Sequence, residues 1–401
     1  VCHFPEENLI ISVNSNYGGN AILSKKCHAL RIASFKAKNE NWLAEHMFVT
    51  GFQLPNKEVF YISGAFPSAS GKTNLAMLKP SGIYSKWKTR LVSDDIAWLF
   101  VNEEGGLSAI NPEAGFFGVV PGTNEKTNPY AMQTIRKNTI FTNVAITKNG
   151  IPWWEGLGNP PKELIDWRGN LWNGKEKATH INARFTVSIY QYPSLSEKID
   201  DPNGVEISAI LIGGRRSTTI PLVLEAFDWL HGVLIGAMLR VETTAAAEGK
   251  VGLVRNDPFA MMPFCGYNMA DYFAHWIKIG SKLKKKLKIF LVNWFRKDKN
   301  GNFIWPGFSE NIRIIEWIIK RVKGEIDAVK TPIGYLPKIE DINIEGLEIN
   351  KKDLKELLEI NKDEWLSEFE ENKKFFESFG NRFPKELWNK FSEIYNNLKN
   401  Y

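Results

Sequence analysis

Residues 59–74 constrain the fold of this chain more than any other segment. An apolar, β-rich run leads there into a loop of small residues, then into Gly-Lys-Thr and a helix-like stretch. This order is typical of phosphate-binding loops, in which backbone N–H groups and the positive end of a helix face an anion. In this interpretation Lys72 reaches the outer phosphates of a nucleotide, and the Thr73 hydroxyl holds a divalent metal ion.

The loop is a variant of the usual pattern. Phe66 stands where the strict pattern G-x-x-x-x-G-K-[ST] has its first glycine. The alternative interpretation is a chance Gly-Lys-Thr in a surface turn, but the strand-like run before the loop and the helix-like run after it favour a phosphate loop.

Composition limits the kinds of protein that this chain can be. Apolar residues make up 43% of the 401 residues and charged residues 24%, which is ordinary for a globular protein. A net charge of +6 suits small anionic substrates and is too small to indicate nucleic-acid binding. The three cysteines lack C-x-x-C spacing, which predicts a reducing compartment without disulfides. Charged residues interrupt the apolar region 220–241, which predicts a buried or amphipathic helix and not a membrane span.

Two adjacent carboxylates lie in an otherwise apolar run. Asp94 and Asp95 fall within the strand-like segment 89–100. Neighbouring residues of a strand point to opposite faces, so the two carboxylates are expected to serve two different ions. An edge-strand pair facing solvent is the alternative.

Three later segments have features of a ligand site, each with an ordinary alternative. Arg215 and Arg216 follow two glycines and suit an anion clamp, or form a solvated basic loop. The small residues of 242–250 suit a mobile lid, or a short helix end. Aromatic residues between 289 and 308 suit stacking on a flat base, or core packing.

Periodicity gives a coarse secondary structure. The expected elements are a strand at 9–13, a helix at 30–38, strands at 207–212 and 289–295, and helices over 340–401.

Taken together, these motifs resemble the GTP-dependent phosphoenolpyruvate carboxykinases. The segments that carry the resemblance are 17–20, 42–47, 66–77, 94–98, 111–118, 137–145 and 293–299. The chain is similar to the C-terminal two-thirds of the family. The resemblance implies an α/β fold with a mixed sheet and a variant phosphate loop, plus part of a second α/β domain.

The resemblance also implies a division of the chain. Residues 1–40 are expected to be the remainder of an N-terminal substrate domain, and 41–338 a nucleotide-binding catalytic domain with a mobile lid at 243–250. The helical spacing of apolar residues, and not the resemblance, predicts that residues 339–401 form a C-terminal helical cap. Because the chain opens at Val1 and not at methionine, we expect a fragment or a processed product. The family has a further N-terminal region, including an arginine that grips the substrate, which these residues lack.

The activity implied is that of a lyase of gluconeogenesis. The family converts oxaloacetate and GTP into phosphoenolpyruvate, GDP and CO₂, with Mn²⁺ at the substrate and Mg²⁺ at the nucleotide. A cytoplasmic monomer without nucleic-acid or membrane partners is expected. The alternatives are a phosphate-loop kinase with another acceptor, or a nucleotide-binding module that is inactive because the N-terminal region is missing.

Residue roles follow from the resemblance alone. The Mn²⁺ ligands are Lys26, His46 and Asp95, and the residues for the nucleotide Mg²⁺ are Thr73 and Asp94. Catalytic residues are Ser70, Lys72, Arg184 and Arg215, and substrate-binding residues are Tyr17, Gly18, Gly19, Ser68 and Asn182. Nucleotide-binding residues are Ala69, Ser70, Gly71, Lys72, Thr73, Asn74, Arg184, Arg215, Phe295, Phe303, Phe308 and Asn311. Ser70 replaces a cysteine that is reactive in the family.

Overall fold

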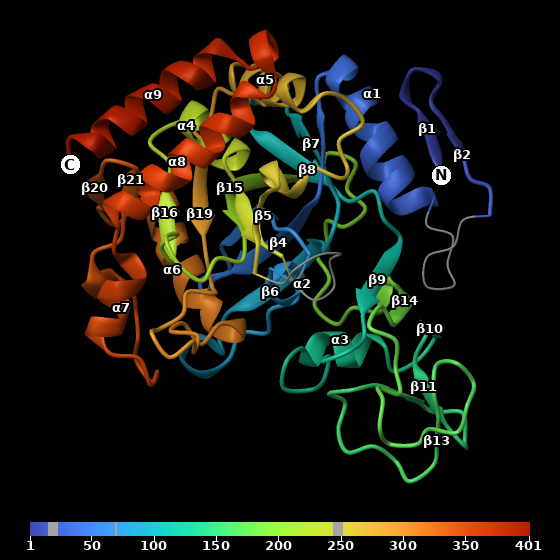
Figure 1. The fold of residues 1–401 in the computed structure, drawn as a ribbon. Coiled ribbons are helices and arrows are strands. Elements are labelled where there is room, and N and C mark those ends of the chain that lie inside the picture. The colour runs from blue at the N-terminus through green and yellow to red at the C-terminus, as the bar shows by residue number, and fades with distance from the viewer. Residues whose placement is uncertain (15–22, 69, 244–251) are drawn as a thin grey trace.

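A mixed sheet of 11 strands organises the computed structural model, which describes residues 1–14, 23–68, 70–243 and 252–401 (Figure 1). The main path of the sheet is β20 (Val329–Thr331), β21 (Gly334–Leu336), β16 (Val223–Glu225), β19 (Lys288–Val292), β15 (Val205–Gly213), β5 (Val59–Ala65), β4 (Met47–Gln53) and β6 (Lys88–Ser93). A branch from β15 adds β8 (Leu107–Ile110), β7 (Ala97–Val101) and β3 (Leu43–Glu45). The expected mixed-sheet α/β class is confirmed.

Three neighbouring strands of this sheet run in the same direction. β15 pairs in parallel with β5 on one side and with β19 on the other. Ile212 lies opposite Ala65, and Gly213 lies opposite Val292, so the three strands end at the same edge. The loops that follow them therefore meet there, which is where parallel α/β sheets usually bind ligands.

Helices cover both faces of the sheet. The α-helices of the described residues are α1 (Ala33–Glu40), α2 (Lys72–Ala76), α3 (Pro129–Thr134), α4 (Trp229–Ala237), α5 (Met269–Gly280), α6 (Ile312–Lys323), α7 (Lys351–Leu358), α8 (Lys362–Glu377) and α9 (Lys385–Lys399), of which α3 lies beside β9 (Gly115–Val119) and β14 (Arg184–Ser188) (Figure 1). A π-helix over Leu23–Ile32 leads into α1. The helical character expected for the C-terminal sixty residues is confirmed, while the three domain boundaries stay predictions.

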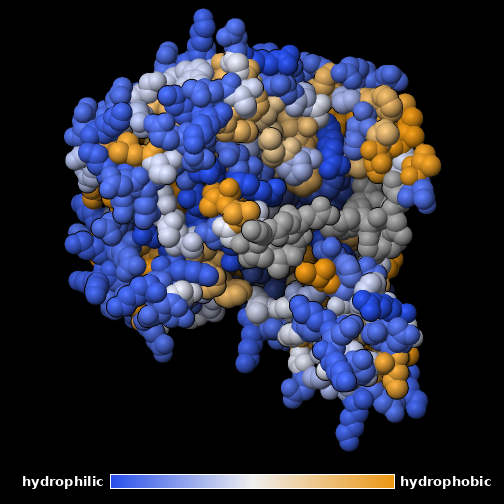
Figure 2. Space-filling view, viewed as in Figure 1, coloured by the Kyte–Doolittle hydropathy of each residue, from blue (hydrophilic) through white to orange (hydrophobic). Residues whose placement is uncertain are grey.

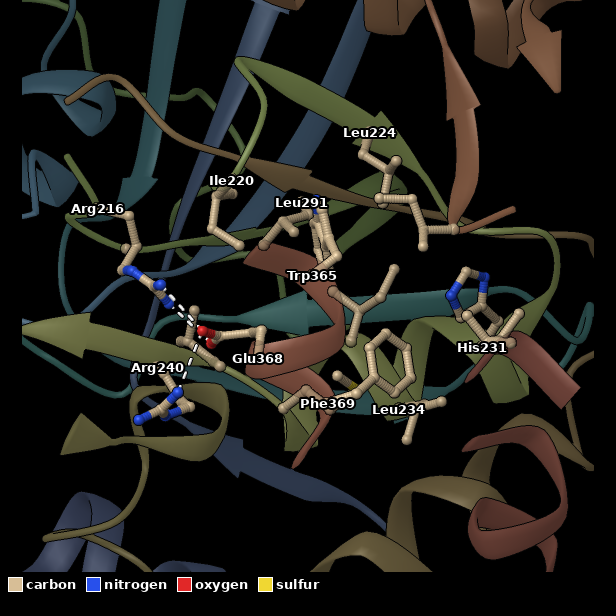
Figure 3. Close-up of a pocket in the computed structure, with 16 residues that line it drawn as sticks. Arg216, Ile220, Leu224, His231, Leu234, Arg240, Leu291, Trp365, Glu368 and Phe369 are labelled. Atoms are coloured by element: carbon tan, nitrogen blue, oxygen red, sulfur yellow. Dashed lines mark hydrogen bonds and ion pairs between the residues drawn. The ribbon is translucent and has the colours of Figure 1, made fainter. Parts of the chain in front are cut away.

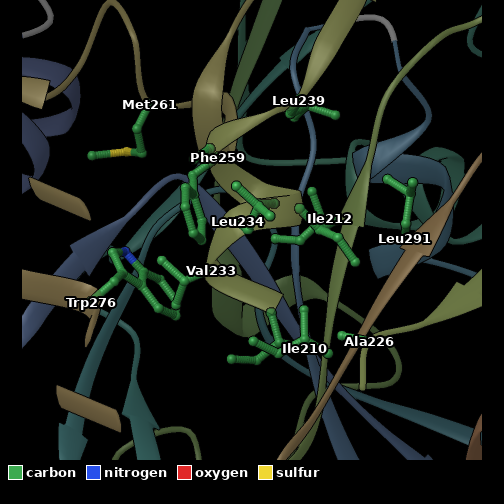
Figure 4. Packing of buried hydrophobic residues seen from close by; sticks show 14 of the residues in the cluster. Ile210, Ile212, Ala226, Val233, Leu234, Leu239, Phe259, Met261, Trp276 and Leu291 are labelled. Carbon is green, nitrogen blue, oxygen red and sulfur yellow. The ribbon is translucent and has the colours of Figure 1, made fainter. Parts of the chain in front are cut away.

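The alternation of side chains along β15 divides the core between these two layers of helices. Ile210 and Ile212 belong to one buried cluster, together with residues of α4, α5, α8 and α9. Figure 4 shows part of this cluster, including Val233 and Leu234 of α4 and Trp276 of α5. Ala209 and Leu211 belong to the cluster formed with α2, α6 and α7 on the other face. A strand buried on both faces reads as a continuous apolar run, which explains the sequence of β15.

Smaller sheets surround this core. A lobe at the lower right of Figure 1 holds β9 (Gly115–Val119), β10 (Thr139–Thr142), β11 (Ala145–Thr147), β12 (Pro152–Trp153), β13 (Leu164–Ile165) and β14 (Arg184–Ser188). Two-stranded sheets pair β1 (Cys2–Phe4) with β2 (Leu9–Ile11), and β17 (Arg240–Glu242) with β18 (Val254–Asn256). Apolar side chains of the β1–β2 hairpin form an exposed orange strip at the upper right of Figure 2.

The helix expected over 220–241 and the bounds of the strand expected over 289–295 were wrong. The apolar region 220–241 is not one helix, because it contains β16, then α4, then the start of β17. The Asp228 side chain accepts the N–H of His231 and so begins a new helix in the middle of the run. The strand expected at 289–295 ends at Val292, where the Asn293 side chain donates to two backbone carbonyls instead. In the part of the chain that the structure describes, no helix has the length and apolar character needed to cross a bilayer.

Candidate active site

The variant phosphate loop connects β5 to α2, as predicted. Gly71 precedes α2 with a φ of +87°, a conformation that glycine adopts without strain. Phe66 is fully buried, and a Cβ atom on Gly213 would lie only 2.0 Å from its ring. The phenylalanine that replaces the usual glycine therefore anchors the start of the loop in the core, in space that Gly213 leaves open.

The Asp95 carboxylate is the centre of a buried cluster beside this loop. Lys72 contacts both Asp95 and His46, and its side chain is buried. The Nζ atom of Lys26 lies 2.7 Å from Asp95 Oδ2, and the Nε2 atom of His46 lies 2.9 Å from Asp95 Oδ1. The three residues assigned to Mn²⁺ by resemblance thus come together from the π-helix, the link between β3 and β4, and the link between β6 and β7.

The orientation of His46 bears on whether the cluster suits a metal ion. Its Nδ1 atom lies 3.1 Å from the carbonyl oxygen of Ala260, which can only accept, so Nδ1 carries the proton. The lone pair of Nε2 then faces the Asp95 carboxylate, which is also an acceptor. Two facing acceptors need a hydrogen-bond donor or a cation between them, and in the structure Lys72 Nζ contacts both. Together with Lys26, this donor set fits a divalent metal ion.

Burial and charge change the protonation of the cluster. Burial, reinforced by Lys26 and Lys72, lowers the pKa of His46 to about 3, so the imidazole is neutral. Burial lowers the pKa of Lys26 to about 8, against the opposing effect of Asp95. Burial alone would raise the pKa of Asp95, but the nearby lysines hold it well below its usual range. Metal binding requires a neutral lysine. Because its pKa is lowered, Lys26 loses its proton more readily than an ordinary lysine does.

The argument that placed Asp94 and Asp95 on opposite faces of a strand was wrong. The two residues lie in a bend between β6 and β7, and the Ser93 hydroxyl donates to the Ile96 carbonyl across it. Asp94 is buried, and burial raises its pKa. Its assignment to a second metal ion therefore loses the support of strand alternation and rests on the resemblance.

Sequence reasoning gave no role to Lys25 and Glu113. Lys25 Nζ lies 3.1 Å from Asp95 Oδ2 and 3.0 Å from Glu113 Oε1. Burial raises the pKa of Glu113 to about 7 and so favours its neutral form. The pKa of Lys25 is also raised, because the carboxylates around it outweigh the effect of its burial. The only signal in the sequence was the lysine pair at 25–26, since Glu113 is distant from both lysines along the chain.

Residues assigned to the nucleotide gather at the same edge of the sheet. The guanidinium of Arg215 lies 4.0 Å from the ring centroid of Phe295, and Phe303 lies 6.0 Å from Phe295, edge to face. A Cβ atom on Gly71 would lie 3.8 Å from the Phe295 ring. Phe308, half exposed, opens a short helical turn (Phe308–Asn311) that packs beside α2. The aromatic residues around the loop are thus partly accessible and not wholly core.

Other assigned residues lie nearby or outside the described part of the chain. Ser70 is buried and Ser68 is exposed, while Thr73 and Asn74 occupy the first turn of α2. Asn311 is buried, and its side-chain oxygen accepts the indole N–H of Trp305. Tyr17, Gly18, Gly19, Ala69 and the lid at 243–250, apart from Thr243, lie outside the described residues.

Two assigned residues lie in the smaller lobe. Arg184 begins β14 and lies 5.3 Å from the ring centroid of Phe117. The Asn182 backbone N–H donates to His180 Nδ1 at 3.0 Å. Among the residues that the structure describes, no hydrogen bond or ion pair links Arg184 or Asn182 to Asp95.

Arg216 does not serve as half of an anion clamp. It forms a bidentate ion pair with Glu368 of α8, at 2.7 and 2.9 Å, and Arg240 joins the same carboxylate at 3.1 Å (Figure 3). These charges lie at one end of a small apolar cavity of about 40 Å³. Arg215 is therefore the arginine of the pair that stands beside the phosphate loop.

Glu368→Gln is expected to destabilise the protein by about 3–5 kcal/mol, because it removes the carboxylate paired with the buried Arg216 and the nearer of the two carboxylates beside Arg240. Glu371→Gln is the matched control on the same helix. Glu371 is 44% exposed and lies 3.8 Å from Arg240, so solvent screens this pair and its loss should cost much less stability than the loss of Glu368. Chemical denaturation of both variants measures the difference, and equal losses would contradict the expectation.

The fold and the cluster define a phosphate-loop, nucleotide-dependent class of protein, with the loop at the edge of a mixed sheet and a metal-compatible lysine–histidine–aspartate set beside it. A family model described as the phosphoenolpyruvate carboxykinase C-terminal P-loop domain matches residues 42–397. A second, the N-terminal domain of the same enzymes, matches residues 1–38. The chain belongs to the GTP-dependent phosphoenolpyruvate carboxykinase family.

Curated relatives agree with this assignment. The chain is 56% identical to the phosphoenolpyruvate carboxykinase (GTP) of Thermoplasma volcanium, over 95% of this chain and 65% of that protein. It is 52% identical to the enzyme of the same name from Anaeromyxobacter dehalogenans, over 96% of this chain and 65% of that protein. It is 52% identical to the phosphoenolpyruvate carboxykinase (GTP) of Chlamydia felis, over 100% of this chain and 67% of that protein.

The chain therefore spans about 65% of the length of the first two relatives. The suspected family is confirmed, and membership implies a requirement for a divalent metal ion. Which part of the longer relatives the chain represents, and the role of each site residue, stay predictions.

Proposed function

We propose that this chain carries out the GTP-dependent conversion of oxaloacetate into phosphoenolpyruvate, GDP and CO₂, a reaction of gluconeogenesis. The observation that carries the proposal is the convergence of Lys26, His46 and Lys72 on Asp95, beside the phosphate loop. The family assignment supports the same reaction. A phosphate-loop kinase with another acceptor is disfavoured, because eight relatives at 49–56% identity are named for this activity.

The cluster holds the substrate metal ion in this proposal. The proposed ion is Mn²⁺. Its proposed ligands are the side-chain nitrogen of Lys26, the imidazole nitrogen of His46 and the carboxylate of Asp95. When bound, the ion supplies Lewis-acid stabilisation for the negative charge of the enolate. Thr73 and Asp94 serve the Mg²⁺ that accompanies the nucleotide.

The remaining residues handle phosphoryl transfer. Loss of CO₂ from oxaloacetate leaves an enolate, whose oxygen attacks the γ-phosphoryl group while GDP leaves. No general base is needed, because the enolate already carries the attacking electron pair. Lys72, Arg184 and Arg215 neutralise the charge that spreads over the transferring group, and most catalysis comes from this positioning and charge stabilisation.

Recognition of the substrates uses the residues around the loop. The residues that line the substrate pocket are Tyr17, Gly18, Gly19, Ser68 and Asn182. The guanine base stacks among Phe295, Phe303 and Phe308, with Asn311 nearby, and the loop residues 69–74 hold the phosphates. We further propose a cytoplasmic monomer.

Oxaloacetate-dependent formation of GDP tests the function directly. The chain is incubated with Mn²⁺, Mg²⁺, oxaloacetate and either GTP or ATP. We expect phosphoenolpyruvate to form in the incubation with GTP and not in the incubation with ATP. GTP binding without turnover would favour a nucleotide-binding module, and phosphorylation of another small acid would favour a kinase.

Thiol reagents are expected to inactivate this enzyme weakly. Ser70 occupies the position of the family's reactive cysteine, and burial raises the pKa of Cys265 to about 12, which keeps its thiol protonated. Cys27 is buried, so Cys2 is the exposed target. Activity after N-ethylmaleimide treatment measures this, with Ser70→Cys as the sensitive comparison. Rapid inactivation that GTP prevents would contradict the expectation.

A further inference from the structure

Two consecutive residues in the link between β18 and α5 adopt a backbone conformation that side chains rarely tolerate. Phe259 has φ +52° and ψ +17°, and Ala260 has φ +57°. Neither is glycine, and the left-handed region is unfavourable for residues with a Cβ atom. Such a conformation persists only where the surroundings over-determine it, and it often marks a functional site.

Packing around Phe259 holds the turn in place. The Phe259 ring is fully buried and stacks on Trp276 of α5, with centroids 4.6 Å apart (Figure 4). On its other side it lies against Gly236 of α4, where a Cβ atom would come within 2.3 Å of the ring. The backbone is closed by the N–H of Ala260 donating to the carbonyl of Asp257 at 2.9 Å. The aromatic ring and the two helices therefore fix the direction of the Ala260 carbonyl.

The strained turn is directed at one histidine. The Ala260 carbonyl accepts from His46 Nδ1 at 3.1 Å, and the sulfur of Met261 accepts the backbone N–H of His46 at 3.2 Å. The ring of Phe264 lies edge to face with the same imidazole, at 4.7 Å. Three residues of one short segment thus contact both the ring and the backbone of His46.

We propose that the Phe259–Ala260 turn is a positioning device that fixes the tautomer and the direction of His46. It keeps the proton on Nδ1 and points the Nε2 lone pair at the Asp95 carboxylate, where the metal ion binds. The inference rests on the proposed metal role of His46. Ala260 touches no substrate in this proposal and acts only through the histidine.

Ala260→Gly tests the device, because glycine adopts positive φ freely and so releases the constraint. The midpoint of thermal unfolding should stay equal or rise, while the Kd for Mn²⁺ alone should increase about tenfold, as for other groups that orient a metal ligand. Lys57→Gly is the matched control. Lys57 has φ +74° in an exposed turn remote from the site, so its replacement should leave Mn²⁺ binding unchanged. An unchanged Kd for the Ala260 variant would overturn the proposal.

A second readout reports the tautomer. The chain has six histidines, so ¹⁵N-histidine labelling gives few signals, and the His46→Ala spectrum identifies the signal of His46. The parent should show a protonated Nδ1 and an unprotonated Nε2 that Mn²⁺ broadens, and Ala260→Gly should show a mixture of tautomers. A protonated Nε2 in the parent would overturn the proposal. If His46→Ala binds Mn²⁺ as tightly as the parent does, the metal assignment itself fails, whatever the Ala260 variant shows.

Discussion

His46→Ala is expected to abolish Mn²⁺-dependent turnover while leaving GTP binding nearly intact. Removal of an orienting partner of a metal ligand typically costs 10- to 100-fold in affinity, so removal of the ligand itself should cost about 100-fold or more. GTP binding should survive, because Phe295 and Gly71, which we assign to the nucleotide, pack beside each other, and because Lys72, which contacts His46, is retained in the variant. Electron paramagnetic resonance of free Mn²⁺ and calorimetric titration with GTP measure the two affinities separately.

His231→Ala is the matched control for that experiment. Both histidines are buried, and burial lowers the pKa of each to about 3, so both substitutions remove a neutral, packed imidazole. His231 lies on α4 and stacks on Phe227, away from Asp95. Its loss should reduce stability without changing Mn²⁺ affinity. Equal loss of Mn²⁺ and GTP binding in His46→Ala would refute the assignment of two separate metal sites.

Lys72→Met is expected to lower kcat by about 100- to 1,000-fold, as when one preorganised donor to a transition state is removed. The buried side chain of Lys72 contacts Asp95 and His46, which places it between the proposed metal ligands and the phosphate loop. The measurement is single-turnover formation of GDP at saturating Mn²⁺ and GTP. Lys79→Met, an exposed lysine just after α2, is the control and should retain full turnover.

The same experiment distinguishes a role of Lys72 in the metal site from a role in neutralising the charge of the phosphoryl group. Lys72 has a direct ion pair with Asp95, so its loss could act through the metal site alone. In that case saturating Mn²⁺ would restore kcat. A persistent loss at saturating Mn²⁺ supports charge neutralisation of the phosphoryl group, and full recovery would contradict it.

The parts of the fold that the sequence predicted depend on local pattern. The order of β5, loop and α2 follows from residues adjacent in the chain, and the buried run of β15 follows from its continuous apolar character. The bend at Asp94 was missed because apolar residues flank it on both sides and because a side-chain bond from Ser93 closes it. The periodicity of apolar residues along the sequence gives no information about such a hydrogen bond.

The site itself depends on contacts between distant residues. Lys26 and Asp95 are 69 residues apart, and Arg216 and Glu368 are 152 apart. Only the resemblance brought the metal ligands together in advance. The family resemblance gave no role to Glu368. Its apolar neighbours Trp365 and Phe369 led to the prediction that this segment, α8 in the structure, belongs to a C-terminal helical cap. The role of Arg216 was therefore left open between an anion clamp and a solvated basic loop, and neither alternative was correct.

The fit between Phe66 and Gly213 has a consequence for engineering and for divergence. The two positions share one volume, since the ring at 66 occupies the space that a side chain at 213 would need. A phosphate loop rebuilt with the usual glycine at 66 would leave a void, and a larger residue at 213 would be required to fill it. The two positions are thus expected to change as a pair, and a library that varies either one alone will yield mostly poorly folded chains.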